Sequence, residues 1–111
     1  MLGILCGLSS EAKIAETISG SRVACAAAVP LKARALARSL VAQGATRLMS
    51  FGLAGALDVS LPVGALIIGE KVIAPNGSWD CNAVWADNLL KRFPQAHCCD
   101  VCGSELSLIH I

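Results

Sequence analysis

The sequence predicts an α/β fold in which helices cover a mostly parallel or mixed central sheet. Apolar runs of strand length alternate along the chain with segments of helical spacing, and this alternation is typical of parallel sheets. The apolar fraction is 55%, above the roughly 50% of average domains, so the chain has ample side chains for a core. We expect residues 1–103 of the 111 to form part of a single domain.

The first predicted strand leads directly into the first predicted helix. Residues 1–8 (MLGILCGL) are a continuous apolar run of strand length. Ser9 and Ser10 offer hydroxyl oxygens for a helix N-cap, and Glu11 is an acid in the first turn. We therefore expect a helix over roughly residues 10–18.

The next three elements continue the alternation. Residues 22–29 (RVACAAAV) predict a second strand, although alanine does not favour strands. Residues 31–43 predict a helix, because their apolar side chains recur every three or four positions and Gly44 follows where a helix would end. Residues 47–52 (RLMSFG) then predict a buried strand.

The second half of the chain begins and ends with a predicted strand. Residues 65–74 predict a strand and residues 75–78 (PNGS) a loop. Residues 82–93 have the spacing of a helix, and residues 96–101 predict the last strand. Residues 104–111 (SELSLIHI) lead into no closing helix, so we expect a foreign or disordered tail and an incomplete fold.

Charge and hydropathy argue against nucleic-acid binding and against a membrane span. Nine basic and eight acidic residues give a formal net charge of +1, so we expect no nucleic-acid partner. The longest apolar run, residues 23–31, is shorter than the roughly 18 residues that a transmembrane helix needs. Residues 1–8 lack the basic segment of a signal peptide, so we expect a cytoplasmic protein without a transmembrane segment.

Six cysteines in a chain of this size suggest two alternatives, a disulfide framework or a metal site. Cys6 and Cys25 lie inside predicted strands and the others follow residue 80, and cytoplasmic thiols stay reduced. His97 precedes a cysteine cluster that includes a CxxC spacing, but structural zinc needs a second pair at a compatible distance along the chain. We expect no bound metal. The cluster consists of Cys98, Cys99 and Cys102.

Two turns at the carboxyl ends of predicted strands are the candidate site, because ligands of open α/β sheets bind there. In the first turn, the hydroxyl of Ser9 and the free N–H groups of a helix start lie beside Glu11. The Glu11 carboxyl would act as a general acid or hold a polar substrate. The alternative is structural: the serines cap the helix, and the charge of Glu11 interacts favourably with the helix dipole.

The second turn is rich in small residues, which let a ligand approach the backbone closely. It contains Gly52, Leu53, Ala54 and Gly55, a GxxG spacing that matches neither the dinucleotide-binding glycine pattern nor a P-loop. The alternative is a tight turn between two packed elements. Both interpretations remain open on the residues alone.

Three segments, taken in order, resemble the nucleoside phosphorylase and nucleosidase superfamily. Residues 3–11 are similar to the family's first strand and acidic turn. Residues 51–57 are similar to its G-[ST]-[AC]-G-G-L loop, and residues 61–68 to the V-G-D-[IL]-V-[IV] strand that follows. The turn CGLSSEA and the loop FGLAG are most similar to the hopanoid-associated phosphorylases of bacteria.

This resemblance implies a three-layer phosphorylase-like fold and an enzyme that cleaves an N-glycosidic bond. The substrate would be a purine nucleoside or adenosylhopane, with phosphate as the acceptor and co-substrate and with no cofactor or metal. Glu11 is the implied catalytic residue. A homo-oligomer is implied for the full-length form. The implied substrate-binding residues are Ser9, Gly52, Leu53, Ala54 and Gly55.

Two departures from the family pattern bear on activity. Leu53 stands where many phosphorylases have a Ser or Thr for phosphate, which leaves hydrolysis of methylthioadenosine or S-adenosylhomocysteine as an alternative reaction. The family's M-E-[SGM] ribose segment and its late catalytic Asp do not occur in this chain, so we expect the chain by itself to be inactive. A non-catalytic α/β fragment or assembly partner is the alternative from a different class.

Overall fold

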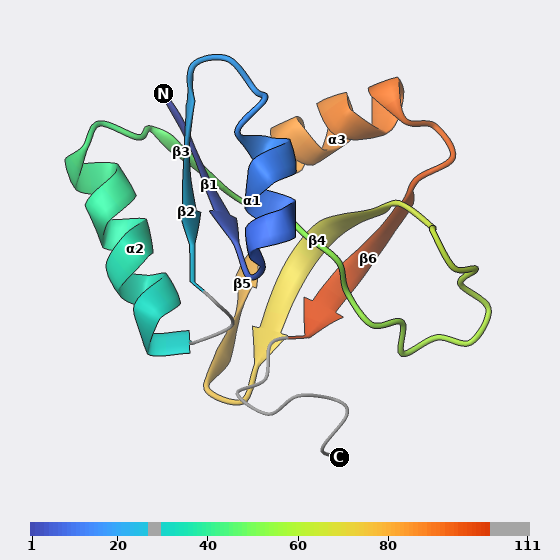
Figure 1. Cartoon of the computed structure of the whole chain (residues 1–111). Helices are drawn as coiled ribbons and strands as arrows, with labels where there is room; N and C mark the ends of the chain where they lie inside the picture. Colours follow the sequence, from blue (N-terminus) through green and yellow to red (C-terminus); the bar gives the residue numbers. More distant parts are fainter. Residues whose placement is uncertain (27–29, 103–111) are drawn as a thin grey trace. The chain divides into compact units, whose positions relative to one another are not determined.

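The structure, a computed structural model, describes residues 1–26 and 30–102 (Figure 1). The chain divides into two compact units, Met1–Ala54 and Gly55–Ile111. Each unit has a three-stranded sheet and at least one helix, so the predicted α/β class is confirmed. The predicted strand end at residues 27–29 and the predicted tail at residues 104–111 lie outside the described residues.

The first unit is a parallel sheet with the first strand in the middle. Its strands are β1 (Leu2–Cys6), β2 (Ser21–Cys25) and β3 (Arg47–Ser50), in the order β2-β1-β3. Both strand pairs that include β1 are parallel. The helices are α1 (Ser9–Ala15) and α2 (Pro30–Ala42), and each connects two parallel strands, as such pairs require.

The two faces of β1 pack against different helices, because successive side chains of a strand point to opposite faces. One face meets α1. On the other face, Gly3 lies under α2: a Cβ on Gly3 would come within 3.2 Å of the Leu40 side chain and 2.9 Å of that of Leu48. Glycine at this position therefore lets helix and sheet approach closely. The α1 face consists of the buried side chains Ile4, Cys6, Ala12 and Ala15, with Leu2, Val23 and Cys25 beside them.

The second unit is a mixed sheet of β4 (Ile67–Ala74), β5 (Gly77–Asp80) and β6 (His97–Cys102) in the order β5-β4-β6. β4 pairs antiparallel with β5 and parallel with β6. α3 (Ala83–Arg92) connects β5 to β6 and contacts β4. It begins at Asn82, whose side-chain oxygen accepts a hydrogen bond from the backbone N–H of Trp85 at 2.9 Å, so this helix has a polar N-cap.

Four expectations need correction. The strand predicted as buried at residues 47–52 is β3, which ends at Ser50 and is mostly exposed because it is an edge strand of its sheet. The strands of the described residues form two sheets where the sequence predicted one central sheet, because apolar runs identify strands and not their partners. The predicted loop at residues 75–78 overlaps β5, an exposed edge strand that pairs through its backbone and has no apolar run. α1 ends at Ala15 and not at residue 18. The backbone N–H groups of Thr17 and Ile18 donate to the carbonyls three residues earlier, those of Ile14 and Ala15, and this spacing is that of a 3₁₀ turn and not of an α-helix.

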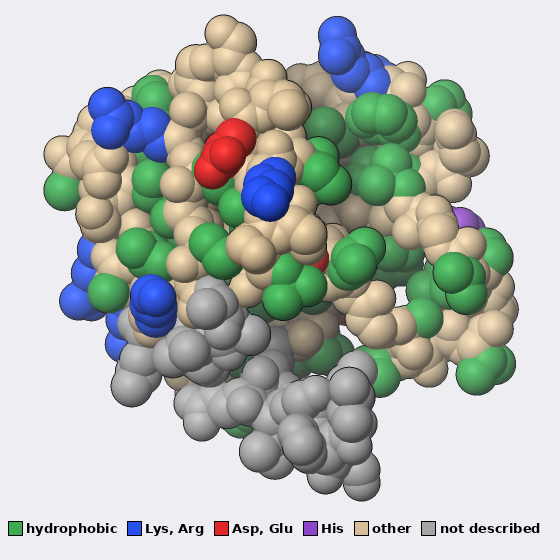
Figure 2. Space-filling view, in the orientation of Figure 1, with side chains coloured by type: hydrophobic (Ala, Val, Ile, Leu, Met, Phe, Trp, Pro, Cys, Tyr) green, Lys and Arg blue, Asp and Glu red, His purple; other side chains and the backbone are tan. Residues whose placement is uncertain are grey.

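Exposed hydrophobic side chains gather over the loop of residues 55–66, as Figure 2 shows on the face in view. Leu57, Val59 and Val63 of this loop are among the most exposed large hydrophobic residues of the described chain. In the ranges 1–26 and 30–102, no helix has both the length and the apolar character that crossing a bilayer requires.

Candidate functional site

The candidate site lies at the carboxyl ends of β1 and β3. α1 leads from β1 to β2 on one side, and α2 carries the chain back to β3 on the other side, so the strand order reverses at β1. Ligands of open α/β sheets bind at such a switch point. The turn after β1 and the loop after β3 are the two segments that the sequence predicted, and both belong to the first unit as far as Ala54.

The Glu11 carboxylate joins this turn to this loop. Its Oε1 accepts hydrogen bonds from the backbone N–H of Gly7 at 3.2 Å and of Leu8 at 2.9 Å. Its Oε2 accepts a third from the backbone N–H of Leu53 at 2.7 Å. Only 7% of the Glu11 surface is exposed. Both oxygens of a buried carboxylate are therefore engaged by the main chain.

The three backbone donors keep Glu11 ionised. The N–H of Leu53 lowers the pKa of the carboxyl most, and those of Leu8 and Gly7 lower it further, whereas burial acts in the opposite direction. The net direction is downward from the ordinary value. Glu11 is therefore a hydrogen-bond acceptor at neutral pH, and the geometry gives the general-acid hypothesis no support.

Gly52 leaves the space that the Glu11 carboxylate fills. A Cβ on Gly52 would lie 2.5 Å from Oε2 and 2.6 Å from Cδ of Glu11. These separations are far below van der Waals contact, so any larger residue would displace the carboxylate from the Leu53 N–H. Glu11, Gly52 and Leu53 thus fit together. We call these three residues, with Gly7 and Leu8, the Glu11 clamp.

The predicted serine cap of α1 is wrong. The N-cap residue is Leu8, which has no side-chain cap bond, and the helix begins at Ser9. Glu11, the third residue of the helix, accepts a hydrogen bond from the N–H of Leu8, which is the half of a capping box that the third helical residue supplies. The side chains of Ser9 and Ser10 are exposed.

The clamp includes only some of the predicted site residues. Glu11, Gly52 and Leu53 lie together, although Leu53, which is 89% exposed, contributes only its N–H. Ser9 and Ala54 are exposed at its margin, and Gly55 is the first residue of the second unit. Sequence reasoning missed the amides of Gly7 and Leu8. The i, i+3 spacing of an acid after an N-cap residue was the available signal.

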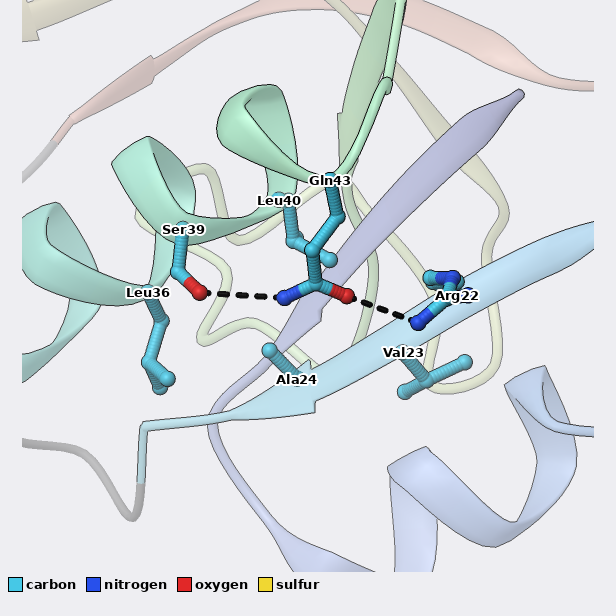
Figure 3. A pocket seen from close by; sticks show the side chains of 7 residues that line it. All are labelled: Arg22, Val23, Ala24, Leu36, Ser39, Leu40 and Gln43. Carbon is cyan, nitrogen blue, oxygen red and sulfur yellow. Dashed lines mark hydrogen bonds between the residues drawn. The ribbon is translucent and has the colours of Figure 1, made fainter.

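A hollow of about 370 Å³ lies elsewhere in the first unit, between β2 and α2 (Figure 3). Its polar groups bond to one another: Arg22 donates to the Gln43 side-chain oxygen at 2.9 Å, and Gln43 donates to the Ser39 hydroxyl at 3.0 Å. The side chains that line it include no acid, thiol or imidazole. We therefore place the candidate site at the clamp and not at the hollow.

The six cysteines are all free thiols. In the part of the chain that the structure describes, no group of three or more His, Cys, Asp or Glu side chains is arranged to hold a metal ion. In β6, Cys98 and Cys99 are half-buried, and Cys102 is exposed.

No family model, no curated protein and no solved structure matches the chain.

Proposed function

We propose that the chain is part of an enzyme that cleaves the N-glycosidic bond of a purine nucleoside with phosphate as the acceptor. The observation that carries this proposal is the Glu11 clamp. It brings residues 3–11 and 51–54 to one edge of a parallel sheet, and these segments contain much of the resemblance to nucleoside phosphorylases. That edge is the switch point at which α/β proteins bind ligands.

The roles within the proposal follow from the geometry. Cleavage of the bond develops positive charge on the sugar and requires a proton for the departing base. Glu11, held ionised, would be a positioning residue that fixes the loop after β3, and not the proton donor. The small residues Gly52 and Ala54 would leave the loop backbone accessible to the sugar or to phosphate.

A binding titration tests the proposal on the chain itself. The ¹⁵N-labelled protein is titrated with adenosine, with and without phosphate, and amide shifts are followed by NMR. We expect saturable shifts at Gly7, Leu8 and Leu53, and weaker binding in Glu11→Gln. The matched control is Glu16→Gln, which removes the same charge from an exposed acid just past the end of α1. Absence of saturable shifts at these three amides would refute the proposed site.

Release of free adenine, measured by chromatography, separates the possible reactions. Turnover that requires phosphate supports phosphorolysis, and turnover without phosphate supports the hydrolytic alternative on methylthioadenosine or S-adenosylhomocysteine. Binding without turnover places the base-protonating acid outside residues 1–111.

A non-catalytic α/β module is the second candidate function. One observation favours it: the backbone engages both oxygens of Glu11, which is the arrangement of a structural carboxylate. On this candidate, Glu11→Gln lowers stability while no nucleoside shifts the clamp amides.

A further inference from the structure

Cys6 and Cys25 are direct neighbours across the first sheet. They are the last residues of β1 and β2, and the parallel register pairs one with the other. Hydrogen-bonded strands lie about 4.8 Å apart, which is inside the 4.4–6.8 Å range of Cα separations found in disulfides. The backbone therefore places these two cysteines at a separation that a disulfide can span.

The two thiols also lie on the same face of the sheet. Paired residues of adjacent strands point to the same side, and both cysteines belong to the apolar cluster under α1. The helix residues in this cluster are Ala12 and Ala15, which have short side chains. Cys6 is buried, at 3% exposure, and Cys25 is half-buried.

We propose that Cys6 and Cys25 are a redox modification site that forms a reversible intramolecular disulfide on exposure to a peroxide. In the first step the Cys25 sulfur attacks hydrogen peroxide: the O–O bond breaks, an S–O bond forms, and one water leaves. In the second step the Cys6 sulfur attacks the Cys25 sulfenic acid: an S–S bond forms and a second water leaves. The two thiols lose two protons and two electrons, and the peroxide is reduced to two waters.

The environment sets this order of events. Cys25 is the more exposed thiol, so the oxidant meets it first. Burial raises the pKa of Cys6 most, and the nearby Glu11, Cys25 and Glu16 raise it further, so little of the Cys6 thiol is thiolate at neutral pH. The strand register places Cys6 directly beside Cys25, so the Cys6 sulfur can attack the Cys25 sulfenic acid within the same molecule.

The disulfide would form next to the Glu11 clamp. Since Cys6 precedes the clamp amides of Gly7 and Leu8, oxidation would alter the Glu11 clamp.

Peptide mapping tests the proposal directly. Trypsin cleaves after Lys13, Arg22 and Lys32, so residues 1–13 contain Cys6 alone and residues 23–32 contain Cys25 alone. The folded, reduced protein is treated with hydrogen peroxide, and the remaining thiols are alkylated before digestion without reductant. We expect a linked peptide of 1–13 and 23–32, lighter than the sum by two hydrogen atoms and lost on treatment with dithiothreitol.

Two further variants make the outcome decisive. In the first, Ser replaces the four cysteines of the second unit, and peroxide should remove both remaining thiols together. In the second, made in that background, Cys6→Ser should leave a Cys25 sulfenic acid that dimedone traps. The proposal is overturned if Cys6 and Cys25 stay as thiols at a peroxide dose that oxidises exposed Cys102. It is also overturned if their links to other cysteines are as abundant as the link between them.

Discussion

Replacement of Glu11 by Gln is the sharpest test of the clamp. The substitution keeps the size of the side chain and exchanges one acceptor oxygen for an NH₂ group that can only donate. If the Gln oxygen faces Gly7 and Leu8, the NH₂ group faces the N–H of Leu53, and this partly buried donor loses its carboxylate partner. The variant thus breaks one hydrogen bond to a charged group and weakens the other two.

The size of the effect follows from these bonds. A hydrogen bond to a charged group contributes about 1.5–3 kcal/mol, and a bond between neutral groups about 1 kcal/mol. Relief of the burial of a charge offsets part of the loss. We therefore expect the free energy of unfolding to fall by about 2–3 kcal/mol, a large share of the 5–15 kcal/mol typical of a domain.

Urea denaturation followed by far-UV circular dichroism measures this change, and amide hydrogen exchange at Leu53 locates it. Glu16→Gln is the control, because Glu16 is exposed and its loss should change stability by less than about 0.5 kcal/mol. The clamp would be refuted if both variants unfold at the same urea concentration and the Leu53 amide keeps its protection in Glu11→Gln.

Three other predictions follow from the described contacts. The pKa of Glu11 is lower in the folded chain than in the unfolded chain, so unfolding takes up a proton in the pH range between the two values. The free energy of unfolding should therefore fall as the pH drops from about 4.5 through the lower folded-state pKa. Thermal melts of Glu11→Gln over the same pH range should lack this contribution to the pH dependence of stability. Gly52→Ala should destabilise by about 2–3 kcal/mol in urea titrations, because its Cβ would meet the carboxylate, whereas Gly7→Ala places a Cβ at an ordinary 3.8 Å and should cost less. Asn82→Ala should cost about 1 kcal/mol in thermal melts followed by Trp fluorescence, because the hydrogen bond from the N–H of Trp85 to the Asn82 side-chain oxygen is removed. An equally large loss in Asn82→Ser, which keeps a side-chain oxygen, would contradict the role of Asn82 as the N-cap.

The sequence was informative wherever a local pattern determines a local structure. The helix predicted at residues 31–43 is α2, one residue away at each end, because its apolar spacing and Gly44 are local signals. The strand predicted at residues 65–74 is β4 with a later start. β5 was missed because an exposed edge strand forms through its hydrogen bonds to β4, which no apolar pattern encodes.

The candidate site was predicted in part for the same reason. Glu11 and the loop of Gly52 and Leu53 were identified because acids and small residues after strands are visible in the sequence. The sequence offered three roles for Glu11: a general acid, a residue that holds a polar substrate, or a partner of the helix dipole. The role as acceptor for the Leu53 N–H depends on a residue 42 positions away, so only the folded chain defines it.

The sequence by itself thus determined the α/β class, most of the helices and strands, and the two turns that carry the candidate residues. The tertiary structure alone decided which strands pair, that backbone N–H groups lower the pKa of Glu11, and that Cys6 and Cys25 are neighbours. The physical reason is the range of the interactions. Hydrophobic spacing and capping act over a few residues, whereas strand register and a buried carboxylate's partners join segments that are distant along the chain.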